Sequence, residues 1–144
     1  MKTAHDLVVE ARTRIREVPI ADAEAAIREA DVLIDVREGD EYHVAHIPGA
    51  VNIPRGVLEF KLSGMPEFDS RDLAIVLYCK TGGRAALAAA ALREMGYLQV
   101  RSVEGGFDAW CAAGLPQTTP SLPDFSSIRV QTTDKPSGGV ARSR

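Results

Sequence analysis

Residues 79–84 could carry the chemistry of a reactive thiol, because they set one cysteine in a glycine-bearing turn: Cys79-Lys80-Thr81-Gly82-Gly83-Arg84. An apolar run at 73–78 precedes this segment, and an alanine-rich run at 85–92 follows it. That order predicts a strand, a tight turn and a helix. The turn would place Cys79 before the unpaired amides and partial positive charge of a helix N-terminus, which favour a thiolate.

This segment is suited to hold a negatively charged sulfur atom. We expect Cys79 to be a catalytic nucleophile that attacks a sulfane sulfur and carries it as a persulfide. The backbone amides that follow would surround the terminal sulfur, because the glycines let successive amides turn inward. Two cationic side chains would attract anionic donors such as thiosulfate. The predicted substrate-binding residues are Lys80, Thr81, Gly82, Gly83 and Arg84.

The composition limits the classes of function. A length of 144 residues fits one domain with a substantial core. The net charge of −3, with acidic and basic residues intermixed, argues against general nucleic-acid binding. No run approaches the roughly 18 apolar residues that a membrane helix needs, and charges interrupt the N-terminal span where a signal peptide is apolar. We therefore expect a cytoplasmic protein without nucleic-acid or membrane partners.

The two cysteines predict no disulfide framework and no metal site. Cys79 and Cys111 do not form a C-x-x-C pair, and no nearby histidines complete a zinc-type set. Cys111 follows Trp110 in a short predicted helix, so we expect it to contribute packing. The sequence indicates neither a metal nor a cofactor.

Strands and helices alternate along the chain. The predicted strands span residues 32–36, 51–53, 73–78 and 99–103. The predicted helices span 3–17, 21–30, 38–46, 56–62, the stretch from the Cys79 turn to 95, and 107–113. Pro19 is expected to end the first helix, and the second is expected to be capped near Asp22. The pattern indicates an α/β fold, doubly wound, with a mainly parallel sheet of about five strands flanked by helices.

Further polar residues are expected near Cys79, because ligands bind outside the carboxyl ends of strands in such sheets. Asp35 and Arg37 close the strand at 32–36, and Glu41 follows them. These three are predicted to support the site rather than react. We expect Arg37 and Glu41 to form a structural ion pair, Asp35 to accept hydrogen bonds from loop amides, and His46 to stabilise a turn.

Three motifs in chain order resemble those of a rhodanese domain. They are Asp35-Val36-Arg37-Glu38 with Glu41-Tyr42 and His46 to Pro54, then Tyr78 to Arg84, then Glu104 to Trp110 with Gly114-Leu115-Pro116. The resemblance to this single-domain sulfurtransferase family implies transfer of sulfane sulfur from thiosulfate or a persulfide donor to cyanide or a thiol. Cys79 matches the persulfide-bearing position. Ala45 departs from the glycine usual before the histidine, and we expect only a local effect.

The resemblance covers roughly residues 18–116, which divides the chain into three parts. Residues 1–17 are predicted to be a helical extension, and residues 117–144 an extended or disordered tail rich in Ser, Thr and Pro. A few apolar tail residues could attach it to the domain or to a neighbouring subunit; they are Leu122, Phe125, Ile128 and Val130.

Two other functions remain open. A phosphatase or arsenate reductase of related fold also uses cysteine and arginine around an anion, but its loop is one residue longer. Here four residues separate Cys79 from Arg84, which suits a single sulfur better than a tetrahedral phosphate. The chain could also be a non-catalytic rhodanese module that carries sulfur or binds a partner, such as a sulfur-relay protein.

Overall fold

The computed structural model describes residues 1–120, which form an α/β fold around one sheet. Its five strands are all parallel and lie in the order β1-β5-β4-β2-β3. The strands are β1 (Arg16–Val18), β2 (Val32–Asp35), β3 (Val51–Asn52), β4 (Ile75–Tyr78) and β5 (Val100–Val103). The predicted fold class, a parallel sheet of about five strands flanked by helices, is confirmed.

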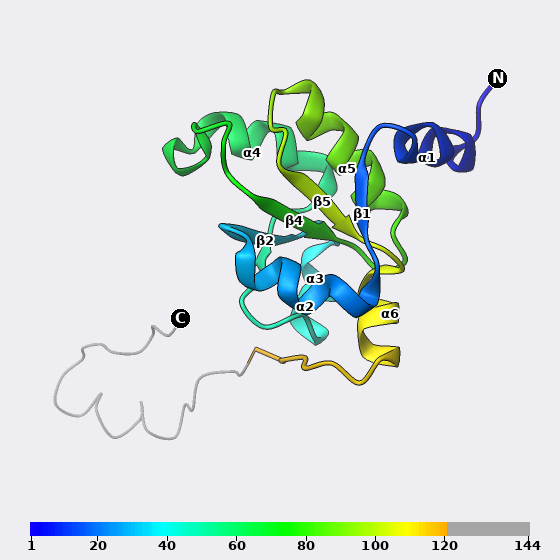
Figure 1. Ribbon diagram of the computed structural model, residues 1–144, viewed down its shortest axis with the longest axis vertical. Helices are drawn as coiled ribbons and strands as arrows, with labels where there is room; N and C mark the ends of the chain where they lie inside the picture. Colours follow the sequence, from blue (N-terminus) through cyan, green and yellow to red (C-terminus); the bar gives the residue numbers. More distant parts are fainter. Residues whose placement is uncertain (121–144) are drawn as a thin grey trace, which may run out of the picture.

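Helices cover both faces of the sheet (Figure 1). They are α1 (Ala4–Arg12), α2 (Ile20–Glu29), α3 (Gly39–Val44), α4 (Leu58–Gly64), α5 (Gly83–Glu94) and α6 (Gly106–Ala112), with short 3-10 turns at Arg55–Val57 and Pro66–Phe68. One core layer lies between the sheet and the helices α4 and α5, and the other lies against α2 and α6.

Strand β4 belongs to both core layers and ends at the predicted turn. Ile75 and Leu77 pack in the layer of α4 and α5, whereas Val76 and Tyr78 pack in the layer of α2 and α6. Successive side chains of a strand point to opposite faces, so a strand buried on both sides reads as a continuous apolar run. Cys79 continues the first set and lies on the α5 side.

The N-terminal segment differs from the prediction. The first helix ends at Arg12, not near Pro19, and residues 16–18 form the edge strand β1, which pairs with β5. The three residues of this strand pair with β5, and this tertiary pairing overrides the local helical pattern. Pro19 instead begins α2 as its N-cap. The cap expected near Asp22 is therefore not formed by that residue, which lies in the first turn of the helix.

Helix α1 packs on the outer side of α5 (Figure 1). Ala11 is fully buried there against Ala86 and Ala90, whose small side chains let the two helices approach closely. The boundary predicted after residue 17 therefore falls inside β1, so the extension is continuous with the sheet.

The last described residues are docked on the domain. Thr118 and His46 exchange backbone hydrogen bonds of 2.9 Å, and the indole of Trp110 donates to the carbonyl of Pro116 at 2.6 Å. The rest of the predicted tail, including its four apolar residues, lies outside the described residues. Within residues 1–120, no helix has the length and apolar character required to cross a membrane.

Candidate active site

Cys79 lies directly after β4 and is almost completely buried. Its Sγ accepts hydrogen bonds from the backbone amides of Gly82, at 3.1 Å, and Ala85, at 3.4 Å. These amides belong to the N-terminal end of α5, where backbone donors lack partners within the helix. The thiol sulfur thus occupies a position where backbone dipoles favour negative charge.

The shape of the turn depends on glycine at one position. Gly82 is the N-cap of α5 and has φ of +115°, a conformation that residues with a Cβ rarely adopt. It directs its amide back toward Sγ. Gly83 then begins the helix.

Helix α6 fixes the other side of the Cys79 turn. The amides of Phe107 and Asp108 donate to the carbonyls of Cys79 and Lys80 at 2.8 and 3.0 Å. Gly106 makes this approach possible: a Cβ there would lie 2.5 Å from the Cys79 carbonyl oxygen. The carbonyls of Cys79 and Lys80 are therefore bound by α6, while the amides of Gly82 and Ala85 bind Sγ.

The cationic residues of the segment each have a carboxylate partner. The Lys80 ammonium lies 2.8 Å from Asp108, and both side chains are at least half exposed. The Arg84 guanidinium makes two hydrogen bonds to Glu41, of 2.8 and 3.1 Å. Their positive charge is thus partly neutralised, and the amides supply much of the polarity next to Sγ. Sequence reasoning missed Asp108, whose position in the third motif gave no sign of this pairing.

Glu41 is held in its charged form mainly by Arg84. Their hydrogen bond, with a further one from the Glu38 amide, lowers the pKa of Glu41 to about 2. The expected ion pair between Arg37 and Glu41 is wrong, because Glu41 pairs with Arg84 across the site. The Glu41–Arg84 pair links α3 to the beginning of α5 beside Cys79.

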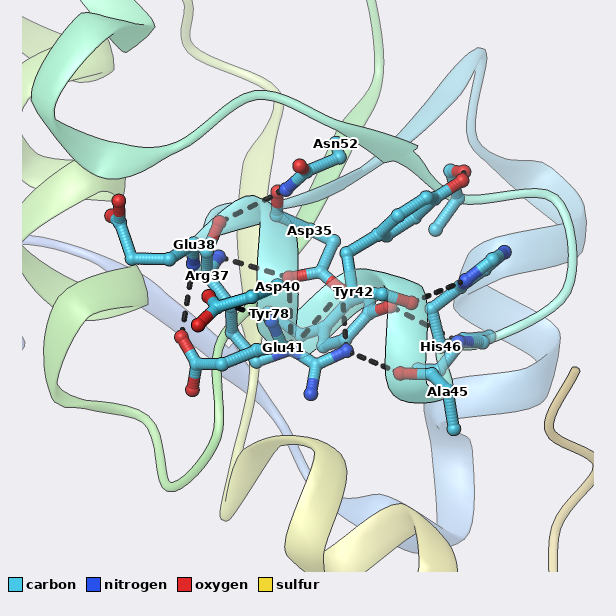
Figure 2. Close-up of polar contacts among 12 residues, drawn as sticks. Asp35, Arg37, Glu38, Asp40, Glu41, Tyr42, Ala45, His46, Asn52 and Tyr78 are labelled. Atoms are coloured by element: carbon cyan, nitrogen blue, oxygen red, sulfur yellow. Dashed lines mark hydrogen bonds and ion pairs between the residues drawn. The ribbon is translucent and has the colours of Figure 1, made fainter. Parts of the chain in front are cut away.

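Arg37 forms a buried ion pair with Asp35 (Figure 2). The Asp35 carboxylate accepts from the Arg37 guanidinium at 2.7 and 3.0 Å, and from the Arg37 amide at 2.9 Å. Asp35 thus accepts the expected hydrogen bond from a loop amide, that of Arg37, and also forms an ion pair that was not predicted. Burial alone would lower the pKa of Arg37, but the hydrogen bond and charge of Asp35 raise it above its ordinary value.

The Arg37 guanidinium also connects the first and third motifs. It donates to the carbonyl of Ala45 at 2.7 Å and lies over the Phe107 ring, 4.5 Å from its centroid. The backbone of Ala45 is extended, with φ of −170°, so alanine fits where the family usually has glycine. Arg37 thereby joins the end of α3 to the start of α6, the helix that binds the Cys79 carbonyl.

Tyr78 and His46 complete this network. The Tyr78 hydroxyl accepts a hydrogen bond of 3.0 Å from the Ile47 amide. Burial and the nearby charge of Asp35 raise the pKa of Tyr78, so the phenol stays protonated. His46 stacks on Tyr42, with ring centroids 3.7 Å apart, and approaches its carbonyl with Nδ1 at 3.0 Å. The sequence placed Tyr78 at the end of a strand and in the second motif, but gave no sign of its hydrogen bond from the Ile47 amide.

Cys111 lies away from the Cys79 turn, farther along α6. It is half-buried, and the Gln117 amide approaches its sulfur at 3.5 Å. No group of three or more histidine, cysteine or acidic residues that could hold a metal ion occurs within the described part of the chain.

The family model described as the rhodanese-like domain matches residues 20–113. The chain belongs to the rhodanese-like domain family. A sulfurtransferase from Allochromatium vinosum is 34% identical over 89 residues, which cover 62% of this chain and 79% of that protein. A thiosulfate sulfurtransferase from Haemophilus influenzae is 31% identical over 105 residues, which cover 72% of this chain and 95% of that protein.

Some relatives are much longer. An adenylyltransferase and sulfurtransferase from Candida albicans is 34% identical over 83 residues, 55% of this chain but only 19% of that protein. The chain thus corresponds to a small part of this relative.

Two solved structures resemble the fold closely. A protein of unknown function from Rhodopseudomonas palustris, described as a possible tyrosine phosphatase, has a TM-score of 0.74 and 34% identity, covering 81% of this chain and 94% of that one. A polysulfide-sulfur transferase from Wolinella succinogenes, described as a homodimer, has a TM-score of 0.65 and 33% identity, covering 80% and 86%.

Replacing Gly106 by alanine tests the contact between α6 and the Cys79 turn. The new Cβ would collide with the carbonyl oxygens of Cys79 and Lys80, at 2.5 and 2.6 Å. We expect Gly106→Ala to lower the free energy of unfolding by about 2 to 5 kcal/mol, measured by urea denaturation. Gly114→Ala is the control. Gly114 has φ of +74°, and a Cβ added there would have no atom of the surrounding structure within 4 Å. This variant should therefore lose only about 1 to 2 kcal/mol. Equal losses would contradict the close-approach argument.

The Glu41–Arg84 pair predicts a specific dependence of stability on pH. Because the folded pKa of Glu41, about 2, lies below its ordinary 4.5, the pair stabilises the fold above pH 4.5 and loses its effect toward pH 2. Both side chains are about one-third exposed, so solvent screening limits the effect to about 1 kcal/mol. Wild type should lose stability relative to Glu41→Gln over this range, in urea titrations at successive pH values. Parallel curves would exclude this linkage.

Proposed function

We propose that the chain is a sulfurtransferase that carries sulfane sulfur as a persulfide on Cys79. The observation that carries this proposal is the position of Sγ, which accepts hydrogen bonds from the amides of Gly82 and Ala85 at the start of α5. Such amides stabilise a sulfur anion without providing a proton. Relatives named sulfurtransferase and thiosulfate sulfurtransferase support this assignment.

The proposed reaction has two displacements at sulfur. The Cys79 thiolate attacks the outer sulfur of thiosulfate; the new S–S bond forms as the old one breaks, and sulfite leaves with the bonding electron pair. A thiolate or cyanide acceptor then attacks the terminal sulfur and restores the Cys79 thiolate. Total charge is conserved in each step. Neither step moves a proton, so a histidine beside Cys79 is not needed as a base.

The same amides that bind Sγ would also favour the persulfide. Its terminal sulfur would lie about 2.05 Å beyond Sγ, within the turn formed by residues 80–84. Lys80, Thr81, Gly82, Gly83 and Arg84 are therefore the proposed substrate-binding residues. Since Lys80 and Arg84 are paired with Asp108 and Glu41, we assign the main stabilisation of the persulfide to backbone amides.

The proposed donors are thiosulfate or a persulfide, and the proposed acceptors are cyanide or a thiol. A sulfur-relay protein is a further candidate acceptor, supported by the relative that is named both an adenylyltransferase and a sulfurtransferase. Cysteine thiols must be reduced to accept sulfur, which supports a reducing, cytoplasmic location.

Mass spectrometry of cysteine variants tests the proposed site. After incubation with thiosulfate, we expect the intact protein to gain the mass of one sulfur atom, and cyanide or a reductant to remove it. Cys79→Ser should abolish both this gain and thiosulfate:cyanide activity, because the attacking thiolate is lost. Cys111→Ser is the matched control, since it removes the other thiol of the chain. Sulfur found on Cys111 would contradict the assignment.

The name of the R. palustris structure, a possible tyrosine phosphatase, makes phosphatase activity the second function to test. The turn here has four residues between Cys79 and Arg84, and Arg84 is directed to Glu41 by two hydrogen bonds. We therefore expect negligible turnover of an aryl phosphate under conditions in which thiosulfate loads Cys79. Robust phosphate release that Cys79→Ser abolishes would overturn the sulfurtransferase proposal.

A further inference from the structure

Helix α1 contacts the Cys79 turn although it precedes the residues that the family model matches, 20–113. The Nη2 atom of Arg12 lies 3.1 Å from the position that a Cβ on Gly82 would occupy. A methyl group of Val8 lies 3.6 Å from the corresponding position on Gly83. Arg12 therefore places a guanidinium beside the residue whose amide binds Sγ.

The position of Arg12 is fixed by packing on both sides. The preceding residue, Ala11, is fully buried against α5. The chain then turns into β1, which pairs with β5 in the sheet. The Arg12 side chain is itself 40% exposed, so its guanidinium remains accessible to a small anion.

Arg12 is paired more loosely than the other two cations at this turn. Its Nε lies 3.4 Å from Oε2 of Glu17, against 2.8 Å for the ion pairs of Lys80 and Arg84. Within residues 1–120, Oε2 of Glu17 is buried and accepts no hydrogen bond, so its contact with the Arg12 guanidinium is an ion pair without a hydrogen bond. The N–H groups of the Arg12 guanidinium are thus available to a ligand.

We propose that Arg12 recognises the charge of the sulfur donor and favours dianionic donors, with Glu17 moderating its effect. This inference rests on the proposed sulfur transfer by Cys79. A thiosulfate dianion that approaches a thiolate is repelled, and a nearby guanidinium reduces that repulsion. The planar fork of arginine also matches the oxygens of a sulfonate-type group. The N-terminal helix thereby contributes a donor-binding residue to the site.

Two donors of different charge test this role in steady-state transfer of sulfur through Cys79 to cyanide. Arg12→Gln should raise the KM for thiosulfate about threefold, the scale of a partly exposed charge pair, with kcat nearly unchanged. The KM for benzenethiosulfonate, a monoanion that transfers the same sulfur and releases sulfinate, should change less. Arg14→Gln, on the same exposed segment, is the matched control and should leave both KM values unchanged.

Three further measurements separate recognition from a structural role. Glu17→Gln should lower the KM for thiosulfate, because it removes the competing carboxylate, whereas a purely structural pair predicts the same loss from either variant. Arg12→Lys, which keeps the charge but lacks the planar fork, should restore part of the thiosulfate affinity that Arg12→Gln loses. Added salt should raise the KM of wild type more than that of Arg12→Gln.

The outcomes distinguish this inference from the proposed function. If wild type takes up no sulfur from either donor, sulfur transfer itself fails and the role of Arg12 falls with it. If wild type is loaded but Arg12→Gln behaves like Arg14→Gln, or weakens both donors equally, the inference alone is overturned.

Discussion

The buried ion pair between Asp35 and Arg37 is the interaction on which the geometry of the site depends. Both residues are nearly inaccessible to solvent, and isolated charges are costly to bury, so each requires the other. The Arg37 guanidinium also donates to the Ala45 carbonyl and lies over the Phe107 ring. The pair therefore positions α6, whose first amides bind the carbonyls of the Cys79 turn. In this way the charge of Asp35, at the end of β2, helps to shape the turn that follows the neighbouring strand β4.

The electrostatics of the site follow from how its charges are paired. Arg84 and Lys80 lie where the sequence places them, but their carboxylate partners reduce the net charge that an anion would meet. What remains next to Sγ is a set of fixed backbone dipoles. Fixed dipoles suit a persulfide, which carries one negative charge and must pass its outer sulfur on to an acceptor.

Local pattern was enough to predict much of the fold and the Cys79 turn. An apolar run, two glycines and an alanine-rich segment each restrict the backbone over a few residues. Contacts distant in sequence were not predictable in this way. Arg37 and Glu41 have helix-type spacing, but Arg37 precedes α3 and turns to Asp35. Strand β1 is equally non-local, since three residues become a strand only by pairing with β5.

The N-terminal helix shows why motif likeness does not define the whole site. The matched region begins at residue 20, yet the packing of Ala11 on α5 brings Arg12 to Gly82. The small side chains of α5 allow this approach, and they lie in the segment that follows the Cys79 turn. The alanine-rich sequence thus has two consequences: it supplies the helix whose amides bind Sγ, and it provides the surface on which a further cation is carried to that turn.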